Sequence, residues 1–163
     1  MGKACPNAGT INPLECADGH YCPIGTEAPM QFPCPYGTYA GGVRHLESRS
    51  QCQPCPPGRA CLLGMFDLKD THKCQPGYAC PGSNSSPYSN PCFGSYNPDF
   101  GSASCIICPA GHYCPVKSRT PFVCEPGYYC PEGTALMNTH PCPDGTYNPV
   151  HGATSETDCI PAP

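Results

Sequence analysis

One cysteine spacing recurs along the chain and limits what it can fold into. Two cysteines with five residues between them, and glycine at the fourth position, occur five times: CADGHYC (16–22), CPPGRAC (55–61), CQPGYAC (74–80), CPAGHYC (108–114) and CEPGYYC (124–130). A glycine at a fixed place between two cysteines indicates a turn with positive φ beside a cross-link. We therefore expect small repeated modules, each organised around such a motif.

The remaining cysteines define the period of the repeat. Twelve residues after the motifs that end at 22, 80 and 130, a further cysteine opens CPYGTY, CFGSY and CPDGTY, and CQPC (52–55) and CIIC (105–108) follow in two units. A complete unit thus carries six cysteines. The predicted segments are 1–15, the end of a preceding repeat, then repeats 16–73 and 74–123, and an incomplete repeat 124–163.

The composition excludes a conventional hydrophobic core. Leu, Ile, Val and Phe account for only 20 of 163 residues, while 24 Pro and 18 Gly interrupt helices and central strands. The 17 cysteines provide covalent cross-links instead, as in small extracellular domains. The predicted fold class is small and disulfide-rich, with short β pieces, turns and little regular secondary structure, and its stability should depend on oxidation.

The same composition indicates a compartment and excludes several partners. Disulfides on this scale persist in an oxidising environment, which indicates an extracellular or cell-surface location. The net charge of −4 and the low charged fraction of 12% argue against nucleic-acid binding. No apolar run approaches the ~20 residues of a membrane span, so we expect no membrane insertion by this segment.

The repeated motifs resemble a known family. The stretch CPDGTYNPVHGATSETDC (142–159), followed in the other units by C-x2-C-P-x-G-x-x-C, resembles the ephrin-receptor-like cysteine-rich repeat, a relative of the tumour necrosis factor receptor modules. The resemblance covers essentially the whole chain, although CFGSY is one residue short and lacks the proline. It implies an elongated rod of tandem cysteine-rich modules.

Cysteine spacing does not determine the pairing, because six cysteines allow 15 connectivities. The resemblance implies that each loop after the GTY-type motif closes on itself, through Cys34–Cys52, Cys92–Cys105 and Cys142–Cys159. It also implies bridges between successive motifs, namely Cys55–Cys74, Cys61–Cys80, Cys108–Cys124, Cys114–Cys130 and Cys5–Cys22, with Cys16 unpaired. Local bridges within each C-x5-C motif are the alternative, and they would join the units more flexibly.

Metal binding and catalysis are alternative uses of these cysteines and acidic residues. CQPC and CIIC have zinc-ligand spacing, but of the motif positions only His20 and His112 align, whereas a disulfide framework explains all the cysteines. A catalytic nucleophile and base need a rigid pocket, yet the acidic candidates lie in loops: Glu47, Asp67, Asp70 and Asp158. We predict no metal, no cofactor and no enzymatic activity.

Several residues are assigned structural or surface roles. Tyrosines recur beside the cysteines and should cover disulfides in place of an aliphatic core: Tyr21, Tyr39, Tyr96, Tyr113, Tyr129 and Tyr147. The sequon Asn84-Ser85-Ser86 lies in a turn-forming stretch and predicts an N-linked glycan on Asn84. The loop 43–50 and the apolar run LLGMF (62–66) are candidate contact surfaces.

Two functions fit these features. The first is a structural repeat unit of an extracellular fibre or surface coat, in which modules pack on their neighbours. The alternative is an ectodomain fragment of a cell-surface receptor or adhesin that binds a protein ligand. An ectodomain should contain a distinctive binding loop that does not repeat.

The two ends of the sequence favour the fibre. CIPAP (159–163) followed by MGKAC (1–5) aligns with CQPCPPGRAC (52–61), so that Cys159 corresponds to Cys52 and Cys5 to Cys61, with Ala162 in the place of Cys55. The hypothesis is that residues 1–15 of a next copy complete the third repeat in register. Copies would then self-associate head to tail, within one polypeptide or between subunits. A piece cut from a long ectodomain is the alternative.

Overall fold

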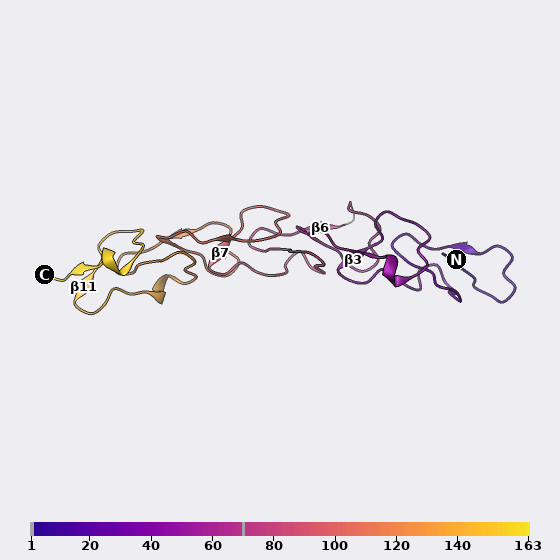
Figure 1. The fold of residues 1–163 in the computed structure, drawn as a ribbon, viewed down its shortest axis with the longest axis horizontal. Helices are drawn as coiled ribbons and strands as arrows, with labels where there is room; N and C mark the ends of the chain where they lie inside the picture. Colours follow the sequence, from indigo (N-terminus) through magenta and orange to yellow (C-terminus); the bar gives the residue numbers. More distant parts are fainter. Residues whose placement is uncertain (1, 70) are drawn as a thin grey trace. The chain divides into compact units, whose positions relative to one another are not determined.

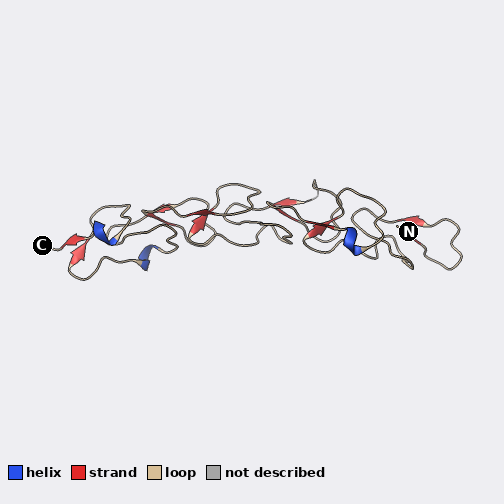
Figure 2. Cartoon of the chain, viewed as in Figure 1, coloured by secondary structure: helices blue, strands red, loops and turns tan. Residues whose placement is uncertain are grey.

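The computed structural model describes residues 2–69 and 71–163; Met1 and the candidate acid Asp70 lie outside this description. Six two-stranded antiparallel hairpins follow one another along the chain, and none of the described residues forms an α-helix. Figure 2 shows the short strands in red and the short 3-10 helices in blue. Every strand has two residues, which confirms the expectation of tandem small modules with short β pieces and turns. The hairpins are β1 (Lys3–Ala4) with β2 (Leu14–Glu15), β3 (Thr38–Tyr39) with β4 (Gln53–Pro54), β5 (Arg59–Ala60) with β6 (His72–Lys73), β7 (Ser95–Tyr96) with β8 (Ile106–Ile107), β9 (His112–Tyr113) with β10 (Phe122–Val123), and β11 (Thr146–Tyr147) with β12 (Ile160–Pro161).

The chain forms two compact units. One comprises the residues up to Cys74 together with Cys80–Ser89, and the other comprises Gln75–Ala79 and Asn90–Pro163. The first contains the hairpins from β1 to β6, drawn in indigo to magenta in Figure 1, and the second contains those from β7 to β12. The repeat boundaries expected at 73/74 and 123/124 stay a prediction from cysteine spacing.

Two kinds of hairpin alternate. In the first kind, the last two residues of the GTY-type motif form a strand. It pairs with the strand that follows the second cysteine of the GTY loop, as in β3 and β4, where Tyr39 lies opposite Gln53. Short single-turn 3-10 helices precede β4 and β12, namely η1 (Arg49–Gln51) and η3 (Glu156–Asp158), and η2 (Met137–Thr139) lies between them. The second kind links one C-x5-C motif to the next, as in β9 and β10, where Tyr113 lies opposite Phe122 and the two rings stack.

The structure contains eight disulfides. Three of them close the GTY loops as expected from the family resemblance: Cys34–Cys52, Cys92–Cys105 and Cys142–Cys159. The other five lie within the C-x5-C motifs: Cys16–Cys22, Cys55–Cys61, Cys74–Cys80, Cys108–Cys114 and Cys124–Cys130. The expected pairs Cys55–Cys74, Cys61–Cys80, Cys108–Cys124, Cys114–Cys130 and Cys5–Cys22 are therefore wrong, as is the unpaired state of Cys16. Cys5 is the free cysteine, and it is exposed.

The glycine in each motif explains the local pairing. Gly58 adopts φ 79°, and this left-handed turn brings the Cα atoms of Cys55 and Cys61 to 5.7 Å, within the range that a disulfide bridges. Gly58 also donates a backbone hydrogen bond to Cys80 (2.7 Å) and accepts one from Cys74 (3.0 Å). Successive motifs are thus joined by backbone hydrogen bonds, where the family resemblance had implied sulfur bridges.

Small clusters of cysteine and aromatic side chains take the place of a core. Tyr21 packs on a cluster that includes Cys34 and Leu46, and Tyr39 packs on Cys55, Cys61 and Met65. These two contacts confirm, for Tyr21 and Tyr39, that the rings cover disulfides. Most of the buried residues are cysteine or alanine, so the covalent links hold together a fold with little apolar surface to bury.

Candidate functional site

The repeated contact between modules is the most regular feature of the structure, and the motif glycines form it. At six of them a Cβ would come within 3 Å of the backbone carbonyl oxygen of a residue farther along the chain: Gly2 to His45, Gly19 to Gly64, Gly37 to Ser83, Gly77 to Lys117, Gly94 to Gly133 and Gly111 to Gly152. The residue that brings the carbonyl always has positive φ, between 52° and 80°. We call it the covering residue.

Backbone hydrogen bonds hold each covering turn in place. The N–H of Gly133 donates to the carbonyl of Cys108 (2.8 Å), and the carbonyl of the next residue, Thr134, accepts from the N–H of Cys114 (2.9 Å). Thr134 is buried, and its hydroxyl donates to the carbonyl of Pro131 (2.6 Å), which tightens the turn. The covering residues were not predicted from sequence, although most lie three residues after the second cysteine of a motif.

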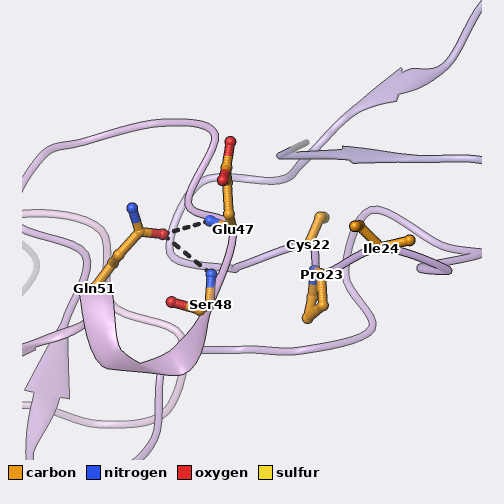
Figure 3. A pocket seen from close by; sticks show the side chains of 6 residues that line it. All are labelled: Cys22, Pro23, Ile24, Glu47, Ser48 and Gln51. Atoms are coloured by element: carbon orange, nitrogen blue, oxygen red, sulfur yellow. Dashed lines mark hydrogen bonds between the residues drawn. The ribbon is translucent and has the colours of Figure 1, made fainter.

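A pocket of about 500 Å³ lies beside the first motif and is lined by Cys22, Pro23, Ile24, Glu47, Ser48 and Gln51 (Figure 3). The amide oxygen of Gln51 accepts hydrogen bonds from the N–H groups of Glu47 (2.5 Å) and Ser48 (3.1 Å). The hydroxyl of Ser48 is bonded to that of Ser50 (2.8 Å). Gln51 therefore orders the loop backbone.

Asp158 orders the corresponding loop of the third repeat, as Gln51 does in the first. Its carboxylate accepts hydrogen bonds from the N–H groups of Thr154 (2.7 Å) and Ser155 (3.1 Å). These two bonds lower the pKa of Asp158 below its usual value. Of the acids weighed in the sequence, Asp158 is thus a loop cap, Glu47 lines the pocket, and Asp67 accepts a bond from the N–H of Lys69 (2.7 Å).

The loop 43–50 folds back on the first motif. Arg44 forms a two-pronged ion pair with Asp18, through Nε to Oδ1 and Nη2 to Oδ2, each 3.0 Å. Glu15 contacts both Lys3 (2.9 Å) and His45 (2.7 Å), and the hydrogen bond from Lys3 is the main reason that the pKa of Glu15 is lowered. All these groups are exposed, so the pairs position the loop more than they stabilise the fold.

The run LLGMF (62–66) is partly buried and partly exposed. Met65 is buried and Phe66 packs on the cluster of Leu46, whereas Leu62 and Leu63 remain exposed. Within this candidate contact surface, Leu62 and Leu63 are thus open to solvent. Among the other described residues, Ile11 and Ile24 are the most exposed large apolar side chains, at 91% and 84%.

Asn84 lies in a covering turn. It follows Ser83, its carbonyl accepts from the N–H of Cys61 (2.8 Å), and its side-chain oxygen accepts from the N–H of Gly82 (3.0 Å). The side chain is partly exposed. Glycosylation at Asn84 stays a prediction.

Neither a metal centre nor a membrane span emerges from residues 2–69 and 71–163. No group of three or more His, Cys, Asp or Glu side chains there is arranged to hold a metal ion. No helix in that part of the chain is long and apolar enough to cross a membrane.

Comparison with known proteins finds distant similarity to cysteine-rich regions. The mouse protein "Sushi, von Willebrand factor type A, EGF and pentraxin domain-containing protein 1" is 25% identical over 185 residues, which cover 85% of this chain and 4% of that protein. Its rat counterpart is 26% identical with the same coverage. The human "Signal peptide, CUB and EGF-like domain-containing protein 2" is 30% identical over 129 residues, 73% of this chain and 12% of that protein. No family model matches.

The chain spans only a small part of the curated relatives that it matches, between 4% and 12%. It is a cysteine-rich repeat region like those of extracellular multidomain proteins, and its modules resemble non-catalytic regions of such proteins. Its eight disulfides and this similarity indicate an extracellular location. The finer identification as an ephrin-receptor-like repeat stays a prediction.

Proposed function

We propose that the chain is a structural repeat unit of an extracellular fibre or surface coat, with copies joined head to tail. The observation that carries the proposal is the regular backbone contact between motifs. The second cysteine of a motif donates to a residue farther along the chain: Cys22 to Leu46 (2.7 Å), Cys61 to Asn84 (2.8 Å) and Cys130 to Ala153 (2.9 Å). A backbone contact that recurs in this way along the chain suits an array built by repetition.

The chemistry of the surface supports a structural role. The side chains that order the loops, Gln51 and Asp158, use their polar atoms on neighbouring backbone. The charged residues around the first motif pair with one another: Lys3 with Glu15 across a hairpin, and Arg44 of the loop 43–50 with Asp18 of the motif. These polar and charged groups are thus engaged with other parts of the chain itself.

A second candidate is a cell-surface ectodomain that binds a protein ligand. Exposed apolar side chains favour it, among them Phe93, which with Leu136 and His140 borders a pocket of about 380 Å³. The matched relatives are named for several extracellular domain types, so a segment within a larger binding protein is compatible with their similarity.

Electron microscopy separates the two functions. The chain is expressed in an oxidising secretory host, purified, and examined by negative stain at rising concentration, with sedimentation velocity in parallel. Fibres with a constant axial repeat are expected. Isolated particles at every concentration, in a sample with all eight disulfides formed, would refute the fibre and leave the ectodomain.

A further inference from the structure

The hairpin of β5 and β6 places two cations opposite each other. Arg59 and Lys73 are partners in its antiparallel register, and directly opposed residues present their side chains on the same face. Like charges in this arrangement destabilise a hairpin. Among the residues that the structure describes, neither cation forms an ion pair with a carboxylate. Asp67, in the loop between the two strands, accepts a hydrogen bond from the N–H of Lys69 (2.7 Å).

The other hairpins of the same kind do not contain this pair of cations. At the same register position, β1 and β2 have Lys3 opposite Glu15, and the two side chains form an ion pair of 2.9 Å. In β9 and β10 the corresponding residues are His112 and Val123. The pair of cations is therefore a local departure from the repeat. A feature that weakens the fold at one place only points to a function there.

The guanidinium of Arg59 is held in one orientation. Its Nη1 donates hydrogen bonds to the carbonyl of Leu68 (2.9 Å) and to the hydroxyl of Thr71 (2.8 Å), and Thr71 is itself buried. Its Nε and Nη2 form the edge that can bind an oxyanion with two parallel hydrogen bonds, and they have no acceptor among the described residues. A side chain that is already ordered loses little conformational entropy when it binds a ligand.

This hairpin lies in the interior of the sequence. Residues 59 and 73 are farther from either end than the span of any of the six covering contacts, so the neighbouring modules are part of the chain. Lys73 is nevertheless exposed, and Arg59 is partly exposed. With its neighbouring modules in place, the hairpin thus offers both cations to another molecule.

We propose that Arg59 and Lys73 form a binding site for a sulfated polysaccharide, in which one sulfate group bridges the guanidinium and the ammonium. Two sulfate oxygens accept from the Nε and Nη2 edge of Arg59, and a third accepts from Nζ of Lys73. A carboxylate has no third oxygen, which favours sulfate over an acidic peptide. Lys and Arg clusters suit heparin-like polymers, and the extracellular location indicates this class of anion.

The site does not depend on the proposed head-to-tail assembly. It consists of one pair of cations in a chain whose net charge is −4, so its binding should be sensitive to salt. A glycan on Asn84 would lie beside the hairpin, because Asn84 bridges to Ala60 of β5. Endoglycosidase treatment before the measurement removes this complication.

The first experiment measures binding to immobilised heparin by biolayer interferometry at low and at physiological salt. The wild type should bind, and more weakly as salt rises. Lys73→Glu should weaken binding at least about tenfold, because it removes one cation and pairs the other. The variant copies the Lys3–Glu15 arrangement, so its midpoint of unfolding in urea should not fall below that of the wild type.

Arg119→Glu is the matched control for Lys73→Glu. It changes the net charge by the same amount, at an exposed residue in the other compact unit. Its binding to heparin should equal that of the wild type. An equal loss in the two variants would show that net charge governs the binding, and would overturn the site.

Competition with soluble polymers identifies the anion. Heparin should displace the chain from the immobilised polymer, whereas hyaluronan, which has carboxylates and no sulfate, and poly-glutamate should not. Displacement by either carboxylate polymer as effective as that by heparin would overturn the assignment to sulfate.

The remaining outcomes separate this site from the fibre. Absence of wild-type binding to heparin at low salt, or full binding by Lys73→Glu, would overturn the site, whether or not electron microscopy shows fibres. Binding that Lys73→Glu abolishes, in a sample that forms no fibres, would support the site and leave the proposed assembly refuted.

Discussion

The backbone carbonyl of Gly64 lies against the Cα of Gly19, closer than a Cβ at residue 19 would permit. Gly19→Ala should therefore force the two motifs apart, besides straining a residue with φ 76°. We expect a loss of more than about 3 kcal/mol in the free energy of unfolding, measured in urea by tyrosine fluorescence.

Gly42→Ala is the matched control for the Gly19→Ala prediction. Gly42 has nearly the same φ, 72°, but the nearest atom to its added Cβ would be 3.8 Å away. Only the conformational strain remains there, about 1–2 kcal/mol. Equal losses in the two variants would show that the carbonyl contact does not restrict residue 19.

The fold should collapse when its disulfides are reduced. Each bridge across a C-x5-C motif closes a short loop and contributes about 2 kcal/mol in the chain-entropy model, whereas the buried apolar residues are few. Reduction and alkylation should abolish near-ultraviolet circular dichroism and protease resistance. Retention of both signals with every cysteine alkylated would contradict this dependence.

The sequence predicted the parts of the fold that follow from spacing and composition. The tandem modules and the closed GTY loops could be inferred because cysteines and glycines recur at constant separations. The pairing within C-x5-C could not, since Cys55 has two candidate partners along the chain, Cys61 and Cys74, and spacing alone does not choose between them. The covering residues could not be predicted from the sequence, because His45, Ser83 and Lys117 share a backbone conformation but no side-chain type.

Tryptic mapping without reduction should reveal local bridges. Trypsin cleaves after Arg49, Arg59, Lys69 and Lys73, which leaves Cys61 alone in the peptide 60–69. If Cys55 and Cys61 are paired, this peptide is linked to 50–59. If motifs were bridged to each other, it would be linked to the peptide that begins at Cys74, so the masses of the linked peptides distinguish the two connectivities.

An N-linked glycan on Asn84 is expected when the chain passes through a eukaryotic secretory pathway. The sequon lies in a partly exposed turn, which suits recognition by the transferase. Intact mass should fall on endoglycosidase treatment of the wild type and stay constant for Ser86→Ala, which removes the sequon and leaves Asn84 in place. A wild-type mass equal to that of the bare polypeptide would contradict the prediction.

The loop that precedes Cys159 should loosen in acid. Hydrogen bonds from the N–H groups of Thr154 and Ser155 stabilise the Asp158 carboxylate, so its pKa in the folded chain lies below the usual 3.8. For a lowered pKa the stabilisation is fully present above pH 3.8 and is lost as the pH falls through the folded value.

The corresponding loop of the first repeat is an internal control. Gln51 accepts the same pair of backbone hydrogen bonds, from Glu47 and Ser48, with an amide that does not titrate. Amide hydrogen exchange, corrected for the intrinsic effect of pH, should lose protection at Thr154 and Ser155 below pH 3.8 and keep it at Glu47 and Ser48. Asp158→Gln, which copies the arrangement at Gln51, should make the two loops behave alike, and equal acid sensitivity of both loops in the wild type would contradict the role of the carboxylate.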